Sequence, residues 1–248
     1  MQKSSKECKT QIIFGKNPVK EAFKNGSVIE VYLSINFKDE QILEAVHNLK
    51  IPSKYLTTNE LKSLCRNDNH QGVVAKIKGF SYSSLEEIIS IASKKKDGLV
   101  LILDGIEDPH NFGAILRSAD AFSVDGVIIK KHNQVEVNST VMKTSAGASN
   151  FVKVAMVNNL STAIEKLKEN GFWVVSSDGS GTYDYQNLSY DFKTALVVGS
   201  EGFGISQLVL KRSDYIVKIP MTGHVNSLNA SVACSIILSR IRNWFYFF

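Results

Sequence analysis

The sequence predicts an α/β protein made of a small N-terminal α/β unit and a larger C-terminal unit built around a parallel sheet. Two patterns support this prediction. In the first third of the chain, short strand patterns alternate with amphipathic helix patterns. In the remainder, continuous apolar runs rich in β-branched residues are typical of strands that are buried on both faces of a parallel sheet. The length of 248 residues fits one large or two small domains.

The first unit, residues 1–80, alternates strand and helix patterns along its length. Asn17 and Pro18 are expected to be the N-cap and first residue of one helix. Thr57 and Glu60 have the spacing of a capping box for a later helix. The strand patterns are IIF at 12–14, IEVYLS at 29–34, SKYLT at 53–57 and GVVAKIK at 72–78, and the helical patterns contain VKEAF, DEQILEAVHNL and ELKSLC.

A polar connection follows the first unit. Residues 81–97 contain serines, the short helical pattern LEEIISIA and the charged run KKKDG. We expect this segment to be a linker. The second unit is therefore expected over residues 98–248.

The second unit has the pattern of a doubly wound α/β fold, in which helices separate buried strands. The expected strands are LVLILD at 99–104, GVIIK at 126–130, FWVVSS at 172–177, ALVVGS at 195–200 and YIVKIP at 215–220. The expected helices are at 112–122, 139–147, 160–170 and 205–212, with a closing helix from Ser227 to about Trp244. Ligands of such sheets bind outside the carboxyl ends of the strands, so functional residues are expected just after each strand.

Composition excludes several classes of protein. The 16 glycines and 4 prolines are too few for a collagen-like or low-complexity chain. No apolar run approaches the roughly 18 residues that cross a bilayer, and the N-terminus lacks the apolar core of a signal peptide. We therefore expect a soluble protein of the cytoplasm. Cys8, Cys65 and Cys234 have no CxxC spacing, so the sequence indicates neither a disulfide framework nor a zinc site.

The net charge of +5 is concentrated in the first unit. Residues 1–80 contain 13 Lys and Arg against 8 Asp and Glu, whereas residues 81–248 contain 16 of each. This distribution indicates that the basic first unit binds a polyanion and that the neutral second unit has a different function. A lysine-rich solvated surface explains the same numbers, and no arginine run favours one interpretation over the other.

Polar residues follow the first buried strand of the second unit. Asn111 is placed to cap a helix, and Arg117 follows about one and a half turns later. An arginine on a helix of small and apolar residues either binds an anion or pairs with a carboxylate such as Asp120. Both interpretations fit the sequence.

The last two expected strands are followed by a glycine-rich loop and by a polar helix start. The loop GSEGFGIS at 199–206 either lets the backbone approach a ligand closely or is a flexible turn. It does not have the spacing of a dinucleotide or P-loop fingerprint. Ser227 and Asn229 open the closing helix, where each is also an ordinary capping or first-turn residue.

Three segments together resemble a known family. NFGAILRSADAF at 111–122, LVVGSEGFGIS at 196–206 and IPMTGHVNSLNASVA at 219–233 resemble, in order and spacing, the three motifs of the SpoU/TrmH-like RNA 2'-O-ribose methyltransferases of the SPOUT superfamily. KTSAGA at 143–148 resembles a further segment of the family. NHQGVVAKI at 69–77 resembles the end of the L30-like substrate domain in the rRNA guanosine-2'-O-methyltransferase branch. One departure is Asn150, where family members commonly have an acidic residue.

The resemblance implies a C-terminal SPOUT domain with a deep trefoil knot and a small L30-like N-terminal domain that binds the RNA substrate. It implies S-adenosyl-L-methionine as cofactor, held by the backbone around Gly199, Ile219, Met221 and Leu228. It also implies a homodimer in which Arg117 of one subunit faces the cofactor pocket of the other, without a metal or a membrane.

The reaction implied is methyl transfer to a ribose 2'-hydroxyl, with a guanosine of large-subunit (23S) rRNA as the first choice of substrate. The catalytic residues implied are Asn111, Arg117, Glu201, Ser227 and Asn229. Because a guanidinium is a poor base, Arg117 would either lose a proton transiently or hold a substrate phosphate while another group takes the proton. The alternatives are a tRNA substrate within the same family and a catalytically silent RNA-binding or ribosome-assembly protein. A dinucleotide-dependent enzyme is disfavoured because the glycine fingerprint is absent.

Overall fold

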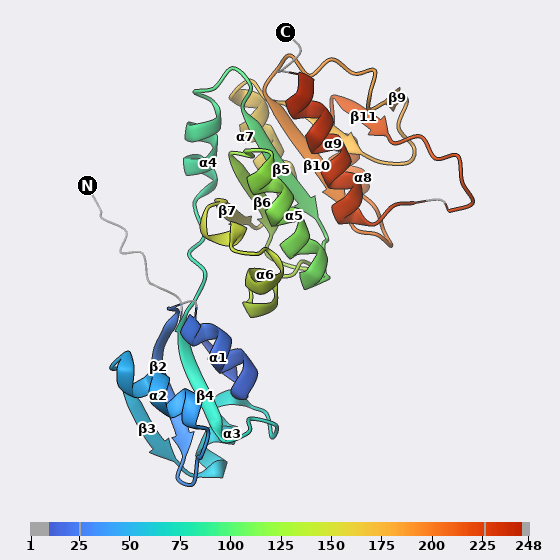
Figure 1. Ribbon diagram of the computed structural model, residues 1–248. Coiled ribbons are helices and arrows are strands. Elements are labelled where there is room, and N and C mark those ends of the chain that lie inside the picture. The colour runs from blue at the N-terminus through green and yellow to red at the C-terminus, as the bar shows by residue number, and fades with distance from the viewer. Residues whose placement is uncertain (1–9, 25, 226, 245–248) are drawn as a thin grey trace. The chain divides into compact units, whose positions relative to one another are not determined.

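The computed structural model describes residues 10–24, 26–225 and 227–244 (Figure 1). The chain divides into two compact units, one ending at Ser81 and the other beginning at Tyr82. Within the described residues, no helix is long and apolar enough to cross a membrane.

The smaller unit is a four-stranded sheet with three helices. Its elements are β1 (Thr10–Phe14), α1 (Lys16–Lys24), β2 (Val28–Ser34), α2 (Glu40–Asn48), β3 (Ser53–Leu56), α3 (Thr58–Cys65) and β4 (Val73–Lys78). The strand order is β1-β4-β2-β3, with β4 antiparallel to β1 and β2, and with β2 parallel to β3. Apolar side chains of the sheet, α1 and α2 form its core.

The helix starts of the smaller unit show what local sequence can and cannot specify. The capping box of α3 is confirmed, because Thr57 Oγ1 accepts the Glu60 N–H and Glu60 Oε2 accepts the Thr57 N–H. The cap expected for α1 is wrong, because this helix begins at Lys16, before Asn17. The Lys16 N–H donates to Gln71 Oε1 at 2.9 Å, so a side chain from a distant loop provides the acceptor that an N-cap would otherwise provide.

The larger unit is a seven-stranded sheet in which every pairing is parallel. Its elements are α4 (Leu85–Ala92), β5 (Leu99–Asp104), α5 (Pro109–Ala121), β6 (Gly126–Lys130), α6 (Ser139–Thr144), η1 (Ala148–Asn150), β7 (Val154–Val157), α7 (Leu160–Glu169), β8 (Trp173–Ser177), β9 (Tyr183–Asp184), β10 (Thr194–Gly199), α8 (Gln207–Leu210), β11 (Tyr215–Lys218) and α9 (Ala230–Trp244). The strand order is β7-β6-β5-β10-β8-β11-β9.

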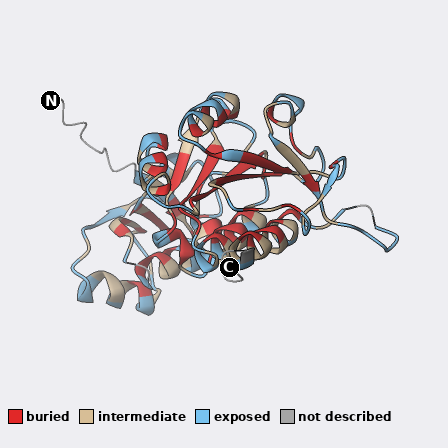
Figure 2. Cartoon of the chain, turned by 90° about the horizontal axis from the view of Figure 1, so that it is seen from above, coloured by how far each residue is buried: buried red, intermediate tan, exposed pale blue. Residues whose placement is uncertain are grey.

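Helices cover both faces of the larger sheet (Figure 1). Side chains of α4, α7 and α8 pack on one face in a cluster with β5, β6, β8 and β10. Helices α5 and α9 lie together on the other face, where the hydroxyls of Ser118 and Ser235 are 2.7 Å apart. Every residue of β5 and β10 is buried, and Figure 2 shows buried strands in red at the centre of the fold. For β5 and β10 the expectation of buried parallel strands is confirmed, whereas in β11 only Val217 is buried and in β8 Trp173 is exposed.

Two strands were not expected, β7 and β9. β9 has only two residues and β7 has four, so neither is long enough to show a clear hydrophobic period. Each is instead held by its neighbour, since β7 pairs with β6 and β9 pairs with β11.

The segment 81–97, expected to be a linker, contains a packed helix. Leu85, Ile88, Ile89 and Ala92 of α4 are buried in the core cluster of the larger unit. The Ser83 N–H also donates to the Val154 carbonyl. The helical spacing of the apolar residues in LEEIISIA therefore indicates an amphipathic helix of the second unit rather than a solvated connection.

The start of α5 differs from the expectation. This helix begins at Pro109 and its N-cap is Asp108, whose carboxylate accepts the His110 N–H at 3.0 Å. Asn111 lies within the first turn, so its side chain is free for contacts outside the helix.

The start of α9 also differs from the expectation, because this helix begins later. The helix begins at Ala230 rather than Ser227. Asn229 Oδ1 accepts the N–H groups of Ser231 at 3.0 Å and Val232 at 3.3 Å, so Asn229 is the capping side chain.

Candidate active site

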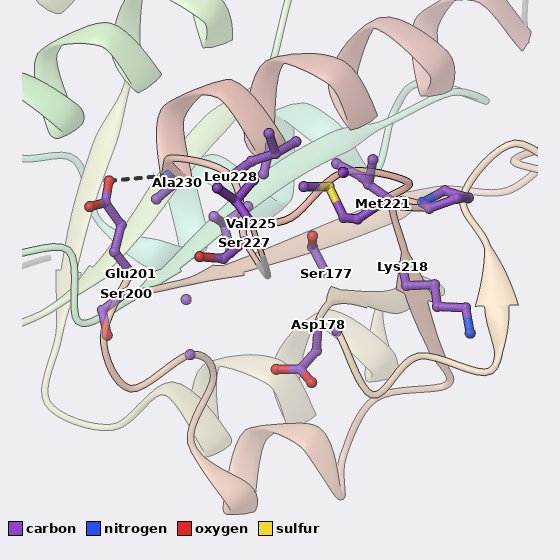
Figure 3. Close-up of a pocket in the computed structure, with 18 residues that line it drawn as sticks. Ser177, Asp178, Ser200, Glu201, Lys218, Met221, Val225, Ser227, Leu228 and Ala230 are labelled. Carbon is purple, nitrogen blue, oxygen red and sulfur yellow. Dashed lines mark hydrogen bonds between the residues drawn. The ribbon is translucent and has the colours of Figure 1, made fainter.

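A cavity of about 630 Å³ lies at the carboxyl ends of β8, β10 and β11, beside the start of α9 (Figure 3). This volume is within the range of roughly 300–1,000 Å³ that is usual for small-molecule sites. Its wall is lined by Ser177, Asp178, Gly179, Val198, Gly199, Ser200, Glu201, Gly204, Lys218, Ile219, Pro220, Met221, Gly223, Val225, Ser227, Leu228, Ala230 and Ala233. The wall thus combines a group of aliphatic side chains with a few charged and hydroxyl groups.

Parallel topology explains why residues distant in sequence meet in this cavity. The strands end at the same edge of the sheet, so the segments that follow them converge there. Six residues singled out from the sequence line the cavity: Gly199, Glu201, Ile219, Met221, Ser227 and Leu228. Asn111, Arg117 and Asn229 do not line it.

Asn111 and Asn229 nevertheless connect to the cavity through Glu201. Asn111 Nδ2 donates to Glu201 Oε1 at 2.9 Å, and Asn229 Nδ2 donates to the same oxygen at 2.5 Å. Asn229 Nδ2 also donates to Asn111 Oδ1 at 2.8 Å. The Ala230 N–H completes the set on Glu201 Oε1 at 3.3 Å, as the dashed line in Figure 3 marks. We call these four residues the Glu201 network.

The Glu201 network joins three chain segments at one carboxylate oxygen. It ties the first turn of α5, the loop after β10 and the start of α9 together. The other carboxylate oxygen, Oε2, accepts no hydrogen bond from any described residue. A smaller cavity of about 200 Å³ on the α5 side is lined in part by Asn111, Glu201 and Ala230. The network therefore lies between two cavities, with one acceptor oxygen available.

Two of the three glycines of loop 199–206, Gly199 and Gly204, are required by the shape of the loop. A Cβ atom at Gly199 would lie 2.3 Å from the Gly204 carbonyl carbon, and Gly204 has a φ of +63°. The backbones of Ser200 and Gly204 exchange hydrogen bonds of 3.1 and 2.9 Å. The loop is therefore a folded turn closed by backbone hydrogen bonds.

Asp104, at the end of β5, holds the far end of this loop. Its side chain is buried, with Oδ1 accepting from Lys130 Nζ at 2.8 Å and Oδ2 accepting the Ser206 N–H at 2.9 Å. Burial by itself raises the pKa of Asp104, but the contacts with Lys130 and Ser206 outweigh it and leave the pKa below its ordinary value. Asp104 is thus a charged anchor that fixes the loop carrying Glu201 to the centre of the sheet.

Arg117 is not brought to the cavity within one chain. It is exposed on α5, and its side chain has no ion pair or hydrogen bond with any described residue. The pairing with Asp120 that the sequence left open is absent among the described residues. An unpaired guanidinium on an exposed helix surface is available to an anion or to another molecule.

Sequence reasoning did not single out Asp178 and Lys218, although both line the cavity. The loop DGSGT at 178–182 lacks the spacing of a nucleotide-binding fingerprint and follows an internal strand. The available signal was its place directly after β8, at the same sheet edge as the other motifs. Among the described residues, no group of three or more His, Cys, Asp or Glu side chains is arranged to hold a metal ion.

Comparisons with known proteins identify the family of the chain. The family model described as SpoU rRNA Methylase family matches residues 98–239, and the model described as RNA 2'-O ribose methyltransferase substrate binding matches residues 12–83. A Staphylococcus aureus protein assigned to the TrmH family of tRNA/rRNA methyltransferases is 44% identical over 235 residues, covering 93% of this chain and 94% of its own length.

Solved structures have the same fold. The SpoU methyltransferase AviRb from Streptomyces viridochromogenes, in complex with AdoMet, has a TM-score of 0.67 and 21% identity, covering 96% of this chain and 92% of that one. The TrmH/SpoU tRNA modifying enzyme of A. aeolicus has a TM-score of 0.56 and 28% identity, covering 65% of this chain and 82% of that one.

Proposed function

Because the chain belongs to the SpoU rRNA methylase family, we propose that it transfers a methyl group from S-adenosyl-L-methionine to a ribose 2'-hydroxyl in RNA. The observation that carries this proposal is the cavity at the strand ends, bordered by the Glu201 network. The three motif segments supply most of its wall and the residues of the Glu201 network.

The cavity fits the proposed cofactor in size and in chemistry. Ile219, Met221 and Leu228 provide an apolar wall for the adenine, and the backbone of Gly199 borders the cavity beside Gly204. Asp178 and Lys218 provide charged partners for the polar parts. When bound, the cofactor supplies a methyl group on a sulfonium, so the protein needs only to align the hydroxyl and to provide a path for its proton.

The Glu201 network positions the reacting groups in this proposal. With Oε1 occupied by three donors, Glu201 is held at the rim of the cavity with Oε2 available as an acceptor. Asn111 and Asn229 orient it, and Ser227 offers a hydroxyl on the cavity wall. These groups are placed to hydrogen-bond a ribose hydroxyl or the guanidinium of Arg117.

Arg117 is proposed to act in the pocket of a second subunit. Its exposure on α5 and its lack of a partner among the described residues support this role, because within one chain it does not line the cavity. Because a guanidinium is a poor base, we assign Arg117 the bidentate contact with a substrate phosphate. The homodimer would pair the surfaces of α5 and α9, and the threading of the segment before α9 past loop 199–206 is proposed to be the trefoil knot.

The smaller unit is proposed to be an L30-like domain that binds RNA. Its excess of basic residues and its match to a substrate-binding family support this role. We propose a guanosine of 23S rRNA or of a ribosomal precursor as the target, in the cytoplasm. A tRNA target is the second candidate, favoured by the tRNA/rRNA description of the S. aureus relative.

Binding calorimetry tests the proposal against its rivals. The protein should bind S-adenosyl-L-methionine and show no affinity for NAD. A dinucleotide-dependent enzyme would show the reverse preference. A silent RNA-binding protein would bind neither, and that result would refute the proposal.

A further inference from the structure

We propose that Asp178 binds a hydroxyl group of the cofactor's ribose and so selects ligands by their sugar. This inference rests on the proposed function and adds a contact that the three family motifs do not contain. Asp178 directly follows β8 and lies on the cavity wall, across from Leu228 in Figure 3.

The two carboxylate oxygens of Asp178 have different surroundings. Oδ1 accepts the Ser180 N–H at 2.9 Å and the Ser180 hydroxyl at 2.7 Å. Oδ2 accepts no hydrogen bond from any described residue. One oxygen therefore shapes the loop, and the other remains as a charged acceptor at the cavity.

The loop that carries Asp178 is held in place by β11. The Asp178 N–H donates to the Val217 carbonyl at 3.0 Å, and the Gly181 N–H donates back to the Asp178 carbonyl at 3.0 Å. A Cβ at Gly181 would lie 2.6 Å from the Val217 carbonyl carbon, so this close contact requires glycine. The carboxylate is thus fixed before any ligand arrives, which lowers the entropic cost of binding.

Gly204 leaves Oδ2 uncovered. A Cβ atom at Gly204 would be 3.3 Å from Asp178 Oδ2, so any larger side chain there would compete for the space in front of this oxygen. Gly204 itself lines the cavity. The free oxygen consequently faces the volume assigned to the cofactor.

A ribose hydroxyl is the partner that fits this acceptor best. An acidic side chain beyond the carboxyl end of a parallel strand is the arrangement by which doubly wound folds bind the ribose of a nucleotide. The other carboxylate of the wall, Glu201, is held by the Glu201 network, and its available oxygen is assigned above to the substrate hydroxyl or to Arg117. Lys218 on the same wall is a suitable partner for a ligand carboxylate, which leaves Asp178 for the sugar.

The test compares three ligands that share the ribose but differ elsewhere. S-adenosylmethionine carries the sulfonium and the amino acid, S-adenosylhomocysteine lacks the sulfonium charge, and 5'-methylthioadenosine lacks both. Asp178→Asn keeps an oxygen for Ser180 and replaces the free oxygen with an amide. Calorimetry should show that the variant binds each of the three ligands at least about tenfold more weakly than the wild type. The factor should be the same for all three, since each loses the same hydrogen bond to a charged group.

Controls separate this inference from the function on which it rests. Asp191→Asn makes the same charge change at an exposed position outside the cavity and should leave all three affinities unchanged. In the wild type, 2'-deoxy or 3'-deoxy methylthioadenosine should bind more weakly than the parent, and Asp178→Asn should abolish that difference.

Three results would overturn the inference while leaving the proposed function intact. They are unchanged affinities in Asp178→Asn, a loss confined to S-adenosylmethionine, and a loss confined to the two ligands with an amino acid. The last two would assign Asp178 to the sulfonium or to the ammonium group. A wild-type protein that binds none of the three ligands would instead overturn the proposed function and this contact with it.

Discussion

Asp104→Asn tests whether a buried ion pair fixes the loop that carries Glu201. Asp104 is 4% exposed and accepts from Lys130 Nζ and the Ser206 N–H, one on each oxygen. Asparagine has nearly the same shape but replaces one acceptor with a donor. Either Lys130 or Ser206 then faces a donor instead of an acceptor. One of the two hydrogen bonds that connect residue 104 to Lys130 and to the loop is therefore lost.

The expected loss of stability is about 2 kcal/mol at neutral pH. A hydrogen bond to a charged group contributes roughly 1.5–3 kcal/mol, and the Lys130 side chain is 26% exposed, so solvent reduces its share. The sign of the pH dependence follows from the lowered pKa of Asp104. The carboxylate stabilises the fold above its unfolded pKa of about 4, and the contribution is lost as the pH falls through the lower folded pKa.

Urea unfolding followed by tryptophan fluorescence measures this difference. Both tryptophans of the chain, Trp173 and Trp244, belong to the larger unit, so the signal reports that unit alone. The gap between wild type and Asp104→Asn should narrow as the pH falls below about 4. Asp120→Asn, an exposed change of the same charge, should have little effect. A difference below about 0.5 kcal/mol at neutral pH, or one independent of pH, would refute the reasoning.

Four further predictions address the site, the smaller unit and the core. Arg117→Ala should reduce methyl transfer by about 10²-fold or more and leave cofactor affinity unchanged. Mixing this variant with Glu201→Ala subunits should restore activity, because one pocket of the mixed dimer then has both residues. Near-normal rates in Arg117→Ala, or no restoration on mixing, would contradict the assigned role. Asn229→Ala should lower the free energy of unfolding, measured in urea, by about 1 kcal/mol because the α9 cap is lost. Asn229→Ser should keep the stability but lose turnover. Turnover of Asn229→Ser equal to that of the wild type would exclude the amide donors from the mechanism. Removal of residues 1–80 should abolish salt-dependent RNA binding in a filter assay but spare cofactor binding, and unchanged RNA binding would contradict it. Cys234 should resist alkylation in the native protein, because burial raises its pKa to about 12; rapid labelling would show that α9 opens.

The sequence predicted the central strands because their signal is local. The runs at 99–104 and 195–200 are apolar throughout, and the parallel sheet buries both of their faces. The cap of α1 could not be predicted in this way, since its acceptor comes from Gln71. The two-residue β9 likewise exists only because β11 lies beside it.

The candidate site was predicted by its motifs more than by physical pattern. Asn111 and Asn229 looked like helix caps, and only the fold brings both amides to Glu201. Asp178 carries no motif at all and gains its significance from packing against β11 and Gly204. Arg117 was visible as an isolated arginine, but its surroundings depend on a second subunit in our proposal.

The most direct test of the central claim is methyl transfer from labelled S-adenosylmethionine to unmodified rRNA and tRNA, followed by alkaline hydrolysis. A 2'-methoxy group has no hydroxyl to attack the neighbouring phosphate, so a methylated linkage survives the alkali. We predict one labelled, alkali-resistant linkage at a guanosine of large-subunit rRNA. Label that alkali releases as ordinary mononucleotides would place the methyl group on a base and contradict the proposed 2'-O reaction.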